Sequence, residues 1–289
     1  MKKMYDPVKY FGLTFLLTWG CWIPAAALSK RPGAGAMGED VMSLMAIGLF
    51  GPLFAALILV FARRGAEGKA LRRDVLGKLT CLRGIRPARA AFMVLVMPAV
   101  IVAAVLLSLA FGQGLEQLQL SPEFSIVEGS VAMSWVVAFL APALEELGWS
   151  SYGIDSLRGR GRLLSAILLF GVLWSLWHLP LIFIDGYYHA GLLAESPAYA
   201  VNFFVSVVPL TVITNWLYYR NGRSILSAIV FHAIVNVCSE AFCVTNFTKC
   251  LVTAVLAAVA VCVVCRDRRF FLSRTEGQGP SAGSLGRAG

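Results

Sequence analysis

The stretch that decides the fold reads LLSAILLFGVLWSLWHLPLIFI and occupies residues 163–184. It contains no Lys, Arg, Asp or Glu, and at a rise of about 1.5 Å per residue it is long enough to cross the hydrocarbon core of a bilayer as one helix. Comparable apolar stretches lie at residues 10–28, 43–62, 91–111, 130–157, 199–219, 223–243 and 247–265. We therefore expect an all-α protein, a polytopic transmembrane helical bundle with about eight spans.

The composition agrees with this fold class. Of the 289 residues, 58% are hydrophobic and only 14% are charged, whereas soluble domains carry roughly 25% charged residues. The mean hydropathy of +0.74 excludes a soluble enzyme, a disordered chain and a disulfide scaffold. We expect one transmembrane domain over residues 1–274 and a disordered, Gly- and Ser-rich tail over residues 275–289.

The basic residues set the expected orientation. With the N-terminus inside, 22 of the 25 Lys and Arg fall in cytoplasmic segments, and only Lys30, Arg31 and Lys249 lie on the other side. Short-loop Lys and Arg mark cytoplasmic loops, so both termini are expected in the cytoplasm. The net charge of +9 then indicates topology and contact with the lipid bilayer, not nucleic-acid binding. The basic loop at 63–90 is interpreted as a topology determinant on the inner leaflet.

A few polar side chains lie inside the predicted spans, where ionisable groups are costly and usually functional. Counted along the helix from the nearest cytoplasmic Arg, their depths are about 20 Å for Glu145, 24 Å for His178, 14 Å for His232 and 20 Å for Asn236. These overlapping depths predict that the four side chains, with Glu146, meet in one reaction centre.

Spacing along each helix supports this interpretation. His232 and Asn236 are four residues apart and share one helix face. Glu145 and Glu146 are adjacent and diverge by about 100°. Only one of the two carboxylates can point squarely into a common site, so the other needs a partner of its own.

These residues form three motifs that resemble the CPBP family of membrane proteases, which includes the type II CAAX prenyl endopeptidases and bacterial proteins linked to bacteriocin processing and self-immunity. The family pattern EExxxR corresponds to EELGWS at 145–150, FxxxH to WSLWH at 174–178, and HxxxN to HAIVN at 232–236. The likeness covers roughly residues 130–240. There are two departures: Ser150 replaces the Arg that pairs with the second Glu, and Trp174 replaces the Phe.

The resemblance implies an intramembrane endopeptidase in a multi-pass cell membrane protein, which we expect in a bacterial plasma membrane. Glu145 with His178 would activate a water molecule, because no motif places a Ser or Cys nucleophile there. His232 and Asn236 would donate hydrogen bonds to the oxyanion, and Glu146 would orient the site. The substrate would be a membrane-associated peptide or protein that reaches the site from the cytosol. The sequence leaves the oligomeric state open.

Three alternatives stay open at this point. Glu145, His178 and His232 match the ligand set of a catalytic zinc, although Asn236 fits an oxyanion donor better, so we favour a mechanism without a cofactor. The loss of the family Arg at Ser150 favours a catalytically silent homologue, for instance a bacteriocin-immunity or scaffold protein. A proton-coupled transporter is disfavoured because no internal repeat is visible.

Overall fold

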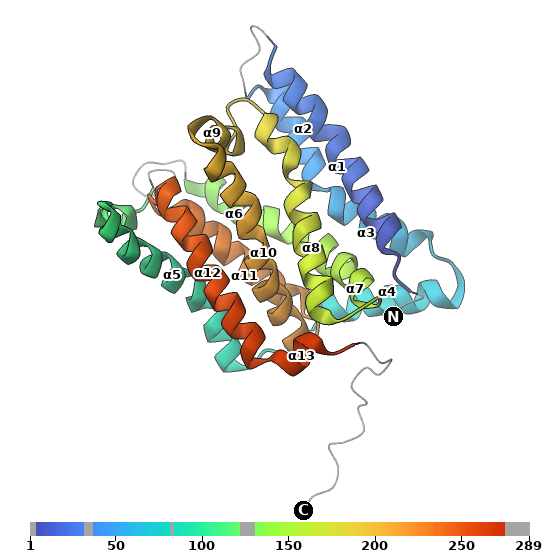
Figure 1. Ribbon diagram of the computed structural model, residues 1–289. Coiled ribbons are helices and arrows are strands. Elements are labelled where there is room, and N and C mark those ends of the chain that lie inside the picture. The colour runs from blue at the N-terminus through green and yellow to red at the C-terminus, as the bar shows by residue number, and fades with distance from the viewer. Residues whose placement is uncertain (1–3, 32–36, 82–83, 122–130, 275–289) are drawn as a thin grey trace, which may run out of the picture.

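The structure is a computed structural model that describes residues 4–31, 37–81, 84–121 and 131–274, and for residues 131–137 it describes the backbone only. Every regular element in these ranges is a helix, which confirms the all-α expectation (Figure 1). The expected tail at 275–289 lies outside the described residues. The longer helices are α1 (Pro7–Ser29), α2 (Glu39–Leu49), α3 (Gly51–Ala62), α4 (Gly65–Leu79), α5 (Pro87–Ser108), α6 (Val131–Gly148), α8 (Leu163–Trp177), α10 (Pro197–Arg220), α11 (Ile225–Ala241) and α12 (Asn246–Arg266). The shorter ones are η1 (Leu109–Phe111), η2 (Leu115–Leu118), η4 (Trp149–Gly153), α7 (Ile154–Arg158), η5 (Leu179–Phe183), α9 (Tyr188–Glu195) and α13 (Arg268–Leu272).

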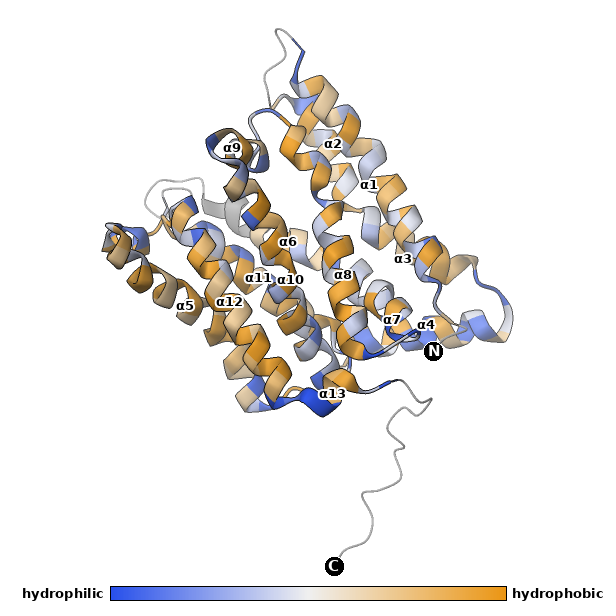
Figure 2. Cartoon of the chain, in the orientation of Figure 1, coloured by the Kyte–Doolittle hydropathy of each residue, from blue (hydrophilic) through white to orange (hydrophobic). Residues whose placement is uncertain are grey.

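Each of the eight predicted spans corresponds to a helix or to a broken helix. Among the described residues, five helices are long and apolar enough to cross a membrane, namely α1, α5 with η1, α8 with η5, α10 and α12. The pair α2 and α3, bent by 42° at its break, gives a sixth if it is one span, and α11 is apolar but shorter. Hydrophobic residues cover the long helices between more polar ends (Figure 2). The protein is a multi-pass membrane protein.

Helix α10 lies near the middle of the bundle and packs against α8, α11 and α12 (Figure 1). Helix α11 also contacts α6 and α5, and α6 contacts α3. Helices α1, α2 and α3 pack together on one side, and α5 packs against α12 on the other. The three motif-bearing helices α6, α8 and α11 therefore belong to one interior.

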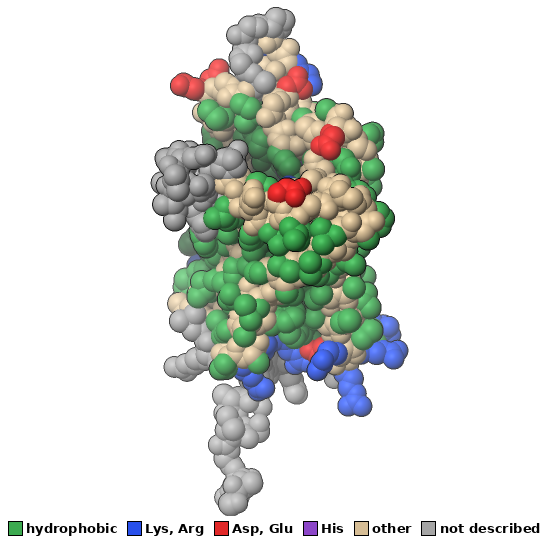
Figure 3. Space-filling model, turned by 90° about the vertical axis from the view of Figure 1, so that its left-hand side faces the viewer, with side chains coloured by type: hydrophobic (Ala, Val, Ile, Leu, Met, Phe, Trp, Pro, Cys, Tyr) green, Lys and Arg blue, Asp and Glu red, His purple; other side chains and the backbone are tan. Residues whose placement is uncertain are grey.

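The two ends of the bundle differ in charge. Lys and Arg side chains gather at one end of the face shown in Figure 3, and Asp and Glu side chains gather toward the other. Helix α1 begins and α12 ends at the basic end (Figure 1). We call the opposite end, where α8 and α11 end and α12 begins, the outer end.

Two helix breaks position the motif residues. Helix α6 gives way after Gly148 to a π-helical turn, η4, whose residues are all buried, and such turns are frequent at functional sites. A Cβ on Gly148 would lie 2.2 Å from the backbone carbon of Pro52, so only Gly allows α6 to approach α3 this closely. Helix α8 ends at Trp177, shortly before Pro180, which cannot continue the helical hydrogen bonds.

The basic loop at 63–90 is more than the surface topology determinant that the sequence predicts. Its helix α4 places Lys78 inside the protein, with the side chain 3% exposed. The Lys78 Nζ lies 2.9 Å from an oxygen of Asp155, which is fully buried, and Arg223 lies 2.5 Å from the same oxygen. Arg223 also forms two hydrogen bonds of 2.7 Å with Asp74. We call these four residues the basic-end cluster.

Tyrosine hydroxyls complete the basic-end cluster. Tyr218 and Tyr219 each donate a hydrogen bond of 2.9 Å to Asp155. Burial alone would raise the pKa of Asp74, but the hydrogen bond from Arg223 and the nearby positive charges outweigh burial and lower that pKa. The cluster is therefore a set of paired charges that ties α4 and α7 to the start of α11 and fills the interior at the basic end.

Candidate active site

Glu145 lies in the last turn of α6 and is held by two indole groups. Trp174 of α8 donates a hydrogen bond of 2.9 Å from its Nε1 to Oε2 of Glu145, and Trp149 donates one of 3.3 Å to the same oxygen. The side chain is buried. Since both bonds go to Oε2, the other carboxylate oxygen remains available to accept a proton.

Glu146 has partners of its own, as the divergence of the two adjacent carboxylates requires. Ser150, in the position of the family Arg, donates a hydrogen bond of 2.5 Å to Glu146 Oε2. His232 Nδ1 lies 3.2 Å from the other oxygen, at ion-pair distance but without hydrogen-bond alignment. Arg158, the nearest basic residue in sequence, bonds instead to the backbone and hydroxyl oxygens of Ser273. The substitution has removed the positive charge at residue 150 but kept a donor for Glu146.

His178 follows the last residue of α8, at the point where the helix breaks. Its Nδ1 lies 2.9 Å from the carbonyl oxygen of Trp174. A carbonyl can only accept, so Nδ1 carries the hydrogen, and Nε2 of the neutral ring is the acceptor. His189 of α9, to which the sequence gives little weight, stacks on this ring with centroids 6.1 Å apart. Its two ring nitrogens are buried without a hydrogen-bond partner among the described residues.

Trp174 joins the motif helices. Its indole donates to Glu145, its carbonyl accepts from His178, and its ring centroid lies 5.0 Å from that of His232 in an edge-to-face arrangement. The sequence treats this residue only as an aromatic replacement for Phe. An indole differs from a phenyl ring by one N–H donor, and that donor is the signal that could have identified Trp174 as part of the site.

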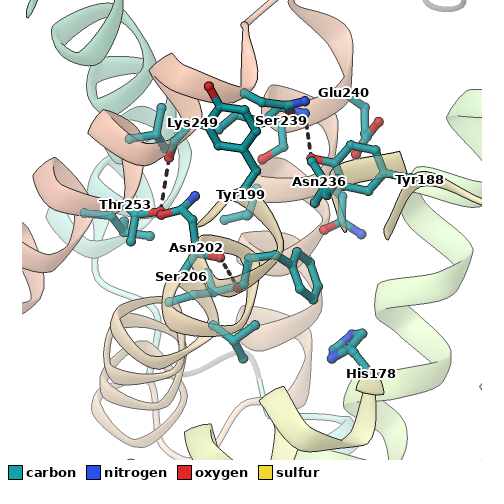
Figure 4. A pocket seen from close by; sticks show the side chains of 18 of the residues that line it. His178, Tyr188, Tyr199, Asn202, Ser206, Asn236, Ser239, Glu240, Lys249 and Thr253 are labelled. Carbon is teal, nitrogen blue, oxygen red and sulfur yellow. Dashed lines mark hydrogen bonds between the residues drawn. The ribbon is translucent and has the colours of Figure 1, made fainter. Parts of the chain in front are cut away.

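A cavity of about 190 Å³ lies beside these residues. His178, His232 and Asn236 line it, together with residues of α9, α10, α12 and Met97 of α5 (Figure 4). The structure therefore brings the two predicted imidazoles and the predicted amide to one space. Glu145 and Glu146 are not among its lining residues and lie behind Trp174 and His232.

The cavity lies in the half of the bundle toward the outer end. It is lined by the end of α8, by α9, and by those parts of α10, α11 and α12 that are nearest the outer end. The sequence predicts a site within reach of the cytosol and thus of the basic end. The structure differs, because the basic-end cluster and its buried neighbours fill the interior on that side.

The zinc alternative does not fit the side chains as they lie. Among the described residues, no three His, Cys, Asp or Glu side chains come together as ligands for a metal ion. Glu145 Oε2 already accepts two indole hydrogen bonds, and His178 Nδ1 is bonded to a carbonyl. We therefore derive no step of the reaction through a metal.

Comparison with known proteins identifies the family. Residues 127–238 match the model of the Rce1-like type II CAAX prenyl endopeptidases. The chain is also 36% identical over 270 residues to CAAX prenyl protease 2 of Methanococcus maripaludis, an alignment that covers 93% of this chain and 97% of that protein. The matched region contains all three motifs. The chain belongs to the Rce1-like type II CAAX prenyl endopeptidase family and is a membrane endopeptidase.

Proposed function

We propose that the protein hydrolyses a peptide bond of a membrane-associated substrate with a water molecule activated by Glu145 and His178. The relative in Methanococcus maripaludis is named a CAAX prenyl protease, and a CAAX sequence is a C-terminal Cys, two aliphatic residues and a last residue, with the Cys prenylated. The proposed substrate class is therefore a lipid-anchored peptide cut near its C-terminus.

The reaction follows from the roles of the side chains. His178 accepts a hydrogen bond from the water at Nε2, and Glu145 takes a proton from it as the water oxygen bonds to the scissile carbonyl carbon. The carbonyl oxygen becomes an oxyanion that accepts hydrogen bonds from His232 and Asn236. The C–N bond then breaks, and Glu145 returns the proton to the leaving amine. Glu146 pairs with His232 and orients it.

One observation carries this proposal. Glu145, His178 and His232 come from three helices and all contact one residue, Trp174, beside a cavity. A buried carboxylate beside imidazoles and a cavity is a candidate for general base catalysis. An ordinary structural histidine between helices would not need the cavity.

The test is peptide-bond cleavage in proteoliposomes. Two sets of membrane peptides should be offered, one with and one without a prenylated C-terminal Cys. Wild type should be compared with Glu145→Gln and His178→Ala, each with and without a strong chelator. Both variants should lose at least about a hundredfold in rate, the usual contribution of a positioned acid or base. Cleavage that withstands the chelator supports water activated by glutamate.

Glu67→Gln is the matched control for Glu145→Gln. Glu67 lies on α4, its side chain is 63% exposed, and its ion pair with Arg63 lies at the surface, so its loss should leave cleavage unchanged. Equal activity of wild type and Glu145→Gln would contradict the proposal. No cleavage by wild type, where another family member is active, would favour the silent homologue.

A further inference from the structure

Lys249 is a cation that lines the same cavity as the two imidazoles. It lies in the first turn of α12, and its Nζ donates a hydrogen bond of 2.9 Å to the Tyr188 hydroxyl and lies 4.6 Å from the centre of that ring (Figure 4). The ammonium group thus meets a neutral partner. By contrast, Lys30, also toward the outer end, pairs with Asp185 at 2.7 Å.

No carboxylate among the described residues lies within ion-pair distance of Lys249. Glu240 of α11 lines the same cavity, but it forms no ion pair with this ammonium. The Tyr188 oxygen accepts from Lys249, so the hydroxyl hydrogen points elsewhere and can donate. Lys249 and Tyr188 therefore offer two neighbouring donors, an arrangement suited to a carboxylate.

The distance from this donor pair to the oxyanion residues matches a short peptide. His232 lies nine residues before the end of α11, and Lys249 lies three residues after the start of α12. With the two helix ends level, the positions differ by about 9 Å along the bundle at 1.5 Å per residue. Three residues of extended chain span about 10 Å. Figure 4 shows His178 at one end of the cavity and Lys249 with Tyr188 at the other.

We propose that Lys249, with the Tyr188 hydroxyl, binds the C-terminal carboxylate of the substrate, so that the three residues after the scissile bond occupy the cavity. The inference rests on the proposed endopeptidase function and defines its specificity: the site measures the distance from the cut to the end of the chain. A substrate that continues beyond those three residues, or that ends in an uncharged amide, lacks the group that this lysine recognises.

The test compares two forms of one probe, a peptide with S-farnesyl-cysteine followed by three apolar residues, prepared as the C-terminal acid and as the C-terminal amide. Wild type in proteoliposomes should cleave the acid with a kcat/KM about tenfold to a hundredfold higher than the amide, the range for a hydrogen-bonded charge. Lys249→Gln should lower cleavage of the acid by the same factor, leave the amide unchanged and bring the ratio near one. Lys249→Arg should restore most of the preference.

The ratio of acid to amide is measured within one preparation, so a loss of folded protein cancels. Glu240→Gln removes a charge of the opposite sign from the same cavity and should preserve or increase the preference for the acid. Equal cleavage of both forms by wild type, or an equal loss of both in Lys249→Gln, would overturn the carboxylate inference and leave the endopeptidase function standing. Cleavage of neither form by wild type would overturn both.

Discussion

Replacing Ser150 by Ala tests whether the hydroxyl at the family's Arg position supports the site. The Ser150 hydroxyl lies 2.5 Å from Glu146 Oε2, and both residues are 2% exposed. The remaining contact of that carboxylate is His232 at 3.2 Å. Without the hydroxyl, one oxygen of a buried carboxylate loses its donor, and water has little room to replace it.

The size of the effect follows from the burial and charge of the pair. A hydrogen bond to a charged group contributes about 1.5–3 kcal/mol, and a buried group left unsatisfied costs a similar amount. If Glu146 orients His232 for the oxyanion, this loss appears in the transition state. We therefore expect Ser150→Ala to lower kcat/KM by about tenfold to a hundredfold, at about 1.4 kcal/mol for each factor of ten.

The neighbouring Ser151 supplies a matched control. It is equally buried at 2% exposed, but its hydroxyl donates to the backbone carbonyl oxygens of α6 and not to a carboxylate. Ser151→Ala removes the same atoms one residue away. Cleavage rates and thermal unfolding in detergent should be measured for both variants and for Ser150→Thr, which keeps the hydroxyl.

The reasoning predicts a difference in activity and not only in stability. Ser151→Ala should keep the wild-type kcat/KM, and Ser150→Thr should stay closer to wild type than Ser150→Ala. If Ser150→Ala and Ser151→Ala have the same kcat/KM, the hydroxyl at residue 150 does not substitute for the family Arg, and the role given to Glu146 is wrong.

Three further predictions concern the basic end and the side of access. Asp155→Asn should destabilise the protein by about 3–5 kcal/mol, because it leaves Arg223 and its buried neighbours without their shared carboxylate; thermal unfolding should show a far smaller loss for Asp267→Asn, which breaks an ion pair near the surface. The pKa of Asp74 is lowered in the folded protein, so the stability that its ion pair contributes is present above the unfolded value of about 3.9 and is lost as the pH falls through the lowered pKa. Unfolding temperatures measured from pH 6 downward should therefore fall less steeply in Asp74→Asn than in wild type, and parallel curves would contradict this assignment. A membrane-impermeant peptide should be cleaved when it is supplied to the outer end and not when it is supplied to the basic end of oriented vesicles, and the opposite result would place the entrance at the basic end.

The sequence predicts the fold class and the meeting of the motifs because both depend on local patterns. Apolar runs without charge can only be membrane helices at this composition, and the structure forms a helix at each of them. Polar groups in such runs must find one another, so Glu146 and His232 lie within 3.2 Å although they are far apart in sequence. The spacing of two adjacent Glu also predicts two separate sets of partners. Which donors those partners would be was not predictable, because Ser150 and Trp174 read as losses or replacements in the motif.

The open half of the bundle could not be predicted from depth along a helix, since depth gives the height of a side chain and not what packs above or below it. The space toward the basic end is filled because Asp155, inside a predicted span but not recognised as a polar site, collects charges from α4 and from the turn before α11. The sequence rule that assigns Lys78 to a surface loop counts its charge but cannot see its partner. Toward the outer end, α8 breaks near Pro180, and the chain turns into the short helix α9 instead of continuing across the bundle. The same charges that set the expected topology therefore also fill one end of the interior, and the cavity remains at the end with few basic residues, where Lys249 lines it.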